Sequence, residues 1–170
     1  HTPIRRQRQM CIRDSFLATE FSVIPIHAAA TENATLSLYD NGNLVTQVTG
    51  TELQYGLQAM GAGNHEVKIV ADNGTETVED VFTFVISPAA VSANPPAGIG
   101  NGITYVDDST VVMSVYAPGK SYIYMVGDFN DWQLDANYLM NQSFDGNTFW
   151  IELNLEPSQE YGCQYFIDLS

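Results

Sequence analysis

The chain has few basic residues. Its 170 residues include 6 Lys+Arg against 20 Asp+Glu, for a formal net charge of −14. Four of the six bases lie in the first fifteen positions, so the remaining chain holds two lysines against 19 acids. So acidic a surface repels phosphate backbones and anionic lipid headgroups. The charge argues against nucleic acid and membrane surfaces as partners. It does not penalise neutral ligands such as sugars, and solubility alone also accounts for it.

Cysteines and long apolar runs are also scarce. The two cysteines, Cys11 and Cys163, do not make a disulfide framework. Cys163 alternates with Tyr161 and Tyr165, which predicts a small core residue rather than a nucleophile. No apolar run reaches the roughly 18 residues of a membrane-spanning helix, and no signal peptide is visible.

The usual patterns of metal ligands are missing. No acid stands in an alternating D-x-D-x-D-G calcium loop. His27 and His65 lack a second histidine or carboxylate at ligand spacing, so we expect them at solvent or edge positions. The sequence therefore predicts no metal and no cofactor.

Residues 1–15 differ from the rest of the chain. They are rich in arginine and show neither a helix nor a strand period. Their sequence resembles translated sequencing adapter, and the alternative is a basic tail or targeting segment. We exclude this segment from the expected fold.

Residues 16–88 are typical of an immunoglobulin-like β-sandwich. About six short apolar-alternating segments lie within 20–86, separated by turn signals such as Asp40-Asn-Gly-Asn43 and Asn73-Gly74. One strand fewer than the usual seven is expected, with the first one missing. Residues 89–101, rich in Pro, Ala and Gly, predict an extended linker between two domains.

Residues 102–170 predict a second β-sandwich. A strand over 121–126 breaks at Gly127 and enters the polar loop Asp128-Phe-Asn-Asp-Trp132. Thr148–Leu155 alternates, with Phe149, Ile151 and Leu153 inward. The chain as a whole is therefore predicted to be all-β, with two immunoglobulin-like or early-set β-sandwiches in tandem.

The run Gly127-Asp-Phe-Asn-Asp-Trp132 resembles the G-D-F-N-x-W motif of early-set sandwiches of carbohydrate-binding module family 48. That module precedes the barrel of many α-amylase-family enzymes (glycoside hydrolase family 13) and also occurs in the glycogen-binding β subunit of AMP-activated protein kinase. Val115-Tyr-Ala-Pro118, Phe149-Trp150 and Gln164-Tyr-Phe-Ile-Asp168 extend the resemblance over 102–170. With the preceding immunoglobulin-like domain, the order is similar to the N-terminus of secreted or periplasmic Bacteroidetes-type α-amylases.

The resemblance implies a sugar-binding platform at Trp132. An α-glucan stacks its C–H faces on aromatic rings, and Asn130, Asp131 and Gln133 would bond its hydroxyl groups. Gln164 stands where glycogen-binding members have a lysine, and their second tryptophan falls beyond Asp168. The alternative is that Trp132 plugs the end of the sandwich, with its indole N–H bonded to a backbone carbonyl; for an accessory domain we favour this alternative.

Trp150 is a second aromatic of interest. Strand alternation places it on the outer face, where a large aromatic marks a contact with another domain or with sugar. We expect an interdomain docking face. The alternative is a bulge that shifts the register and brings Trp150 into the core.

The acids Asp107, Asp108, Asp128, Asp131 and Asp145 all fall in predicted turns. Glycoside hydrolysis needs two carboxylates facing each other across a cleft, and a catalytic barrel takes about 250 residues. We therefore expect solvated turn acids and no catalytic residue in this chain.

Three functions remain open. The chain is either a non-catalytic accessory part of an α-glucan hydrolase, bracing a barrel that lies outside it, or an α-glucan-binding module that uses Trp132. The third possibility is a regulatory or adhesive protein of two sandwiches.

Overall fold

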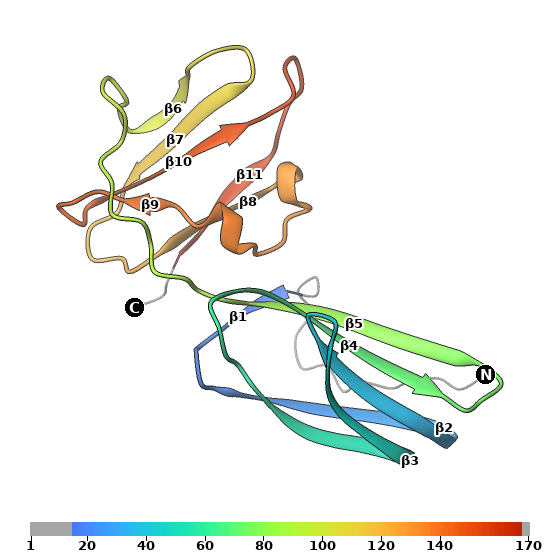
Figure 1. The fold of residues 1–170 in the computed structure, drawn as a ribbon. Coiled ribbons are helices and arrows are strands. Elements are labelled where there is room, and N and C mark those ends of the chain that lie inside the picture. Colours follow the sequence, from blue (N-terminus) through green and yellow to red (C-terminus); the bar gives the residue numbers. More distant parts are fainter. Residues whose placement is uncertain (1–14, 168–170) are drawn as a thin grey trace. The chain divides into compact units, whose positions relative to one another are not determined.

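The computed structural model describes residues 15–167, and the chain divides into two compact units, residues 1–87 and 88–170. The predicted all-β fold is confirmed, because the described residues form eleven strands and only two three-residue 3₁₀ helices (Figure 1). Neither helix is long enough to cross a membrane. The prediction that residues 1–15 stand outside the fold lies almost wholly outside the described residues; Ser15, however, begins β1.

The first unit is one sheet with the strand order β1-β5-β4-β2-β3. Its strands are β1 (Ser15–Ala18), β2 (Val23–Asp40), β3 (Asn43–Gln58), β4 (Gly63–Asp72) and β5 (Thr77–Ile86). β1 pairs in parallel with β5, and the other neighbours are antiparallel.

The first unit has five strands rather than the six short ones expected. Four of the predicted segments merge into the two long strands β2 and β3, and β1, which was not among the six, is the fifth strand. Ala29–Ala34 contains neither glycine nor proline, so β2 continues through it with only a shift in its pairing with β3. The first half of β2 pairs with β3 alone, and that half contains Pro25, which suits such an edge position.

The hairpin of β2 and β3 is bent, so that its outer half, Val23–Ala29 paired with Glu52–Gln58, lies over the rest of the sheet (Figure 1). One hydrophobic core fills the space between this outer half and the rest of the sheet. Ile26 and Leu53 enter this core from the outer half of the hairpin. Leu36, Ile69 and Phe84 enter it from the rest of the sheet, and all five side chains are at most 6% exposed.

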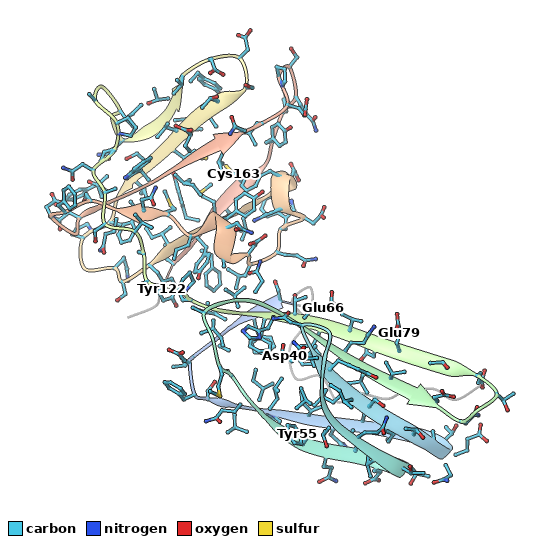
Figure 2. All side chains as sticks on the ribbon, in the orientation of Figure 1. Asp40, Tyr55, Glu66, Glu79, Tyr122 and Cys163 are labelled. Atoms are coloured by element: carbon cyan, nitrogen blue, oxygen red, sulfur yellow. The ribbon has the colours of Figure 1, made fainter. Side chains whose placement is uncertain are left out.

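The expected solvent or edge position of His65 is wrong. Its imidazole is buried and stacks on Phe84 with ring centroids 4.6 Å apart. Nδ1 lies 3.0 Å from the carboxylate of Asp40, which ends β2 and is labelled in Figure 2. Nε2 lies 2.8 Å from the carbonyl oxygen of Gly61. The carboxylate is 25 residues away in the sequence, which is why ligand spacing could not reveal it. His27 is exposed as expected, 3.9 Å from Glu52.

The second unit contains two sheets. Its strands are β6 (Gly102–Tyr105), β7 (Thr110–Tyr116), β8 (Ile123–Gly127), β9 (Asn141–Gln142), β10 (Thr148–Asn154) and β11 (Cys163–Ile167). One sheet has the order β6-β7-β10-β9, and the other is the antiparallel pair β11-β8.

The core of the second unit holds Met113, Ile123, Met125, Met140 and Phe149. The chain passes from one sheet to the other beside Met140, whose N–H donates to the carbonyl of Ile123 just before β9 begins. Ile123 and Met125 of β8 are part of this core. The loop that contains Asp128–Trp132 begins where β8 ends.

The prediction that Cys163 is a core residue is wrong: its side chain is exposed. Within the described residues β11 pairs with β8 alone. Of Tyr161, Cys163 and Tyr165, only Tyr165 packs against the core, and Ile167 at the end of β11 is 41% exposed. At a sheet edge, alternation along a strand does not guarantee burial.

Part of the predicted linker belongs to the second unit. Ser92 forms a parallel bridge with Gln142 of β9. The N–H of Gln142 donates to the carbonyl of Val91, and the N–H of Ala93 donates to the carbonyl of Gln142. Residues 91–93 thus lie along β9 as a short added strand rather than as a free spacer.

Candidate functional site

The loop after β8 begins with a close approach that only glycine permits. A Cβ on Gly127 would lie 2.5 Å from the carbonyl oxygen of Gly162 and 2.7 Å from the ring of Phe129. The φ of Gly127 is 178°, which any residue adopts, so the requirement is one of space rather than of backbone conformation. This glycine lets the loop fold directly against the start of β11.

Asn130 holds the loop to the end of β8. A 3₁₀ turn, η1, spans Asp128–Asn130. The side-chain oxygen of Asn130 accepts the N–H of Gly127 at 2.8 Å, and its amide nitrogen donates to the carbonyl of Met125 at 3.1 Å. Both ends of the Asn130 amide are therefore engaged with the backbone, which makes Asn130 a structural residue of the loop.

Phe129 closes this end of the sandwich. Its ring packs against the core and lies 5.2 Å from the ring of Tyr138, whose hydroxyl donates to the carbonyl of Phe129. Tyr138 belongs to a second 3₁₀ turn, η2 (Ala136–Tyr138). The plugging role expected of Trp132 is taken by Phe129, since Phe129 packs against the core and Trp132 is exposed.

The backbone turns outward at two successive residues with left-handed dihedrals. Asp131 has φ 54° and Trp132 has φ 58°. Aspartate tolerates this region, but for a bulky side chain such as tryptophan it costs on the order of 1–2 kcal/mol. Strain of this kind is concentrated at functional sites. The Trp132 N–H donates to the carbonyl of Gly127, which closes the loop at 2.9 Å.

The indole of Trp132 lies on the outside and is held at its polar end. It is 40% exposed, and its Nε1–H donates to Oδ1 of Asp128 at 2.7 Å. The partner is thus a carboxylate rather than the backbone carbonyl considered above. A Cβ on Gly162 would lie 3.1 Å from Cζ2 of the ring, so the ring rests against the glycine backbone. An aromatic ring held in this way can offer its free surface to a ligand.

Asp128 joins the two segments beside this ring. Its Oδ2 accepts the N–H of Gly162 at 2.6 Å, and its own N–H donates to the carbonyl of Gly162 at 3.0 Å. The N–H of Gly162, followed by the indole N–H of Trp132, holds the pKa of Asp128 below its usual value. From the sequence, Asp128 is expected only to be a turn acid, and no sequence signal points to Gly162.

Two other predicted turn acids behave similarly within their own turns. Asp107 accepts the N–H groups of Ser109 and Thr110, and these bonds lower its pKa. The Ser143 hydroxyl, followed by the N–H of Asn147, lowers the pKa of Asp145. A glycosidase general acid needs a raised pKa instead.

The other predicted sugar contacts lie around the loop and on β11. Asp131 is exposed, and Gln133 is partly buried with its N–H donating to the carbonyl of Asn130. Gln164 is exposed and pairs with Val126 of β8. Gln164 thus lies on β11 and Trp132 in the loop after β8, whereas the side chain of Asn130 is occupied inside the loop.

Trp150 lies on the outer face of β10, as alternation predicts, and is partly buried there. The linker is close to it: the indole N–H donates to the carbonyl of Ala93 at 2.7 Å. The register is not shifted, since Phe149 and Ile151 are buried. Trp150 anchors the strand-like segment 91–93, and its docking to a further domain stays a prediction.

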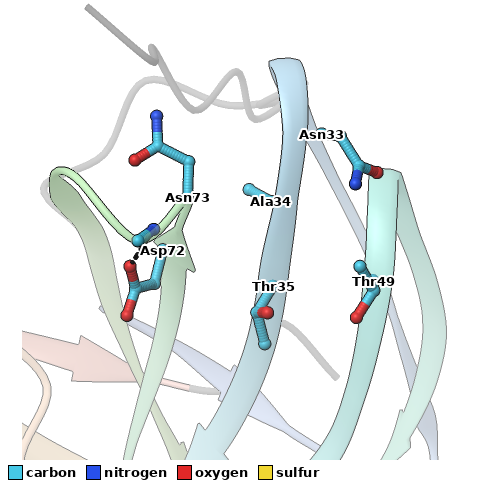
Figure 3. A pocket seen from close by; sticks show the side chains of 7 residues that line it. Asn33, Ala34, Thr35, Thr49, Asp72 and Asn73 are labelled. Atoms are coloured by element: carbon cyan, nitrogen blue, oxygen red, sulfur yellow. Dashed lines mark hydrogen bonds between the residues drawn. The ribbon is translucent and has the colours of Figure 1, made fainter.

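A shallow pocket of about 340 Å³ lies in the first unit (Figure 3). Its lining comes from β2, β3, the end of β4 and the β4–β5 turn: Asn33, Ala34, Thr35, Thr49, Asp72, Asn73 and Gly74. This lining has no aromatic ring on which a sugar could stack. Asp72 and Asn73 also accept N–H groups of their own turn. The pocket is therefore a less suitable sugar site than the Trp132 loop.

No protein-family model and no curated protein sequence matches the chain. Solved structures match it by fold at low sequence identity. A titin tandem of immunoglobulin domains is 12% identical with a TM-score of 0.37, and the match covers 98% of this chain and 93% of titin's. A Group B Streptococcus pullulanase is 14% identical with a TM-score of 0.31, covering 99% of this chain and 22% of the enzyme.

A Bacteroides uniformis β-glucuronidase is 9% identical with a TM-score of 0.35, covering 92% of this chain and 28% of the enzyme. The chain thus spans about a quarter of the length of these two enzymes. These similarities concern the fold alone, which is a tandem of immunoglobulin-like domains.

Proposed function

We propose that the chain is a non-catalytic accessory part of a secreted or periplasmic α-amylase-family glycoside hydrolase, where it braces and orients the catalytic barrel. The proposal is supported by the resemblance of Gly127–Trp132 to the early-set carbohydrate-module motif and by the place of each motif residue in the loop. Gly127 allows the close approach, Asn130 fastens the loop, and Phe129 closes the core.

The chemistry of the acids agrees with an accessory role. The carboxyl groups with shifted pKa values, those of Asp107, Asp128 and Asp145, are all shifted downward by hydrogen bonds. They are ionised at neutral pH and engaged in turns, so none of them is prepared to protonate a glycosidic oxygen.

One observation favours a second candidate, direct binding of an α-glucan by this module. The indole of Trp132 stands outside the core, 40% exposed, with its only polar group already bonded to Asp128. What remains accessible is apolar ring surface, which suits the C–H face of a glucose unit. A tryptophan whose role is to fill the core would have its ring buried instead.

Gel retardation on soluble starch tests the second candidate. Wild-type protein should migrate more slowly in a gel containing starch, and Trp132→Ala should migrate as it does in a gel without starch. Phe144→Ala is a matched control, because Phe144 is 74% exposed and belongs to a different turn of the same unit. Equal retardation of wild type and Trp132→Ala would count against the platform.

The coding frame beyond Ser170 tests the bracing role. A barrel with an aspartate nucleophile and a glutamate acid encoded in the same frame would support it. A frame that closes within a few codons would contradict it.

A further inference from the structure

Asp128 makes two contacts that the other turn acids do not. Asp107 and Asp145 accept hydrogen bonds from residues within three positions of themselves. Asp128 reaches a side chain four residues on, the indole of Trp132, and a backbone N–H 34 residues on, that of Gly162. A carboxylate that served only its own turn would need neither contact.

Each of the two carboxylate oxygens of Asp128 accepts a different hydrogen bond. Oδ1 takes the indole N–H at 2.7 Å and Oδ2 takes the Gly162 N–H at 2.6 Å. An indole has a single donor and no acceptor, so its bond to Asp128 fixes the end of the ring that carries Nε1. The bond to Gly162 in turn fixes the carboxylate relative to β11.

Gly162 restricts the position of the far edge of the Trp132 ring. A Cβ there would lie 3.1 Å from Cζ2 and 3.6 Å from Cη2 of Trp132, and 3.2 Å from Oδ2 of Asp128. The ring edge opposite its Cα attachment therefore lies against bare backbone. A side chain at this position would require the indole or the carboxylate to move by a few tenths of an ångström.

We propose that Asp128 is the positioning residue of the Trp132 platform, holding the indole against Gly162 so that the free ring surface is presented in one fixed orientation. This inference rests on the proposed α-glucan-binding function for its purpose, although the positioning itself is independent of it. Asp128 does not touch the sugar. Its effect is to order the ring before the sugar binds, so that the ring loses less conformational entropy on binding.

The test uses a Trp150→Phe background, in which Trp132 is the one tryptophan left of the chain's two. The fluorescence anisotropy, the emission maximum and the acrylamide quenching of Trp132 report how firmly the indole is held. Starch retardation is measured on the same proteins, and far-UV circular dichroism verifies that each is folded.

Three substitutions separate the contacts. Asp128→Ala removes both bonds and should lower the anisotropy, shift the emission to the red and weaken starch retention about fivefold. Asp128→Asn keeps an oxygen for the indole but presents an NH₂ group to the Gly162 N–H, so it should be intermediate. Gly162→Ala keeps the carboxylate but crowds the ring, and it should alter the emission as well. Asp108→Asn, a charge-matched change in an exposed turn, is the control.

The outcomes distinguish the two proposals. If Asp128→Ala lowers the anisotropy although wild type is not retained by starch, the positioning role stands and sugar binding fails. If wild type is retained and Asp128→Ala matches Asp108→Asn in anisotropy and in retention, the positioning role is overturned. Intermediate behaviour of Asp128→Asn would show that the effect follows the hydrogen bonds rather than a general loss of structure.

Discussion

Replacing Gly127 with alanine tests whether the loop depends on space at this position. The new methyl carbon would lie 2.5 Å from the Gly162 carbonyl oxygen, 2.7 Å from Phe129 Cε1 and 3.1 Å from Cys163 Cα. Two of these three atoms belong to backbone, which cannot swing aside. Overpacking typically costs 1–3 kcal/mol, so we expect a loss of about 3 kcal/mol. Because φ of Gly127 is near 180°, which alanine also adopts, backbone conformation adds nothing to this expected loss of stability.

The assay is thermal unfolding followed by tryptophan fluorescence. Both tryptophans, Trp132 and Trp150, lie in the second unit, so their emission reports the unfolding of that unit. A domain of this size loses roughly 4–8 °C in Tm per kcal/mol, which predicts a decrease of at least about 12 °C. Gly100→Ala is the control, since nothing lies within 4 Å of its new Cβ. A Tm for Gly127→Ala equal to that of the control would refute the steric argument.

Three further results are expected. Trp150→Phe removes the bond to the Ala93 carbonyl and should cost about 1 kcal/mol and increase proteolysis of the linker; unchanged proteolysis would contradict the anchoring role. His65→Gln removes a buried partner of Asp40 and should destabilise the first unit by about 2 kcal/mol in calorimetry, whereas a neutral effect would be inconsistent with the contact. The pKa of Asp128 is lowered in the fold, so its contribution is present above the usual aspartate value near 3.9 and is lost as the pH falls through the folded value. The anisotropy of Trp132 should therefore stay constant from pH 8 to about pH 5 and decrease only below about pH 4.

Local patterns predicted the strands well. The alternation over Thr148–Leu155 placed Phe149, Ile151 and Leu153 in the core and Glu152 outside, as observed. Side chains in a strand alternate between faces whatever their partners are. The motif also predicts the break at Gly127. It does not predict the exposure of Trp132, whose ring was expected to plug the end of the sandwich.

Contacts between distant segments were not predictable in the same way. The burial of His65 depends on a carboxylate 25 residues away, and the Asp128–Gly162 bond spans 34 residues. The exposure of Cys163 depends on β11 having β8 as its one described partner. Alternation identifies a face, but only the neighbouring strands decide whether that face is covered.

The proposed binding of an α-glucan depends on the outward-facing indole that the Gly127–Trp132 loop carries. Titrating maltoheptaose into the Trp150→Phe protein while recording Trp132 emission tests it most directly, because the ring itself is the probe. We expect a saturable change in emission with a Kd of about 1 mM or below, and we expect Trp132→Phe to abolish it. An emission that stays unchanged up to about 10 mM maltoheptaose would contradict the claim.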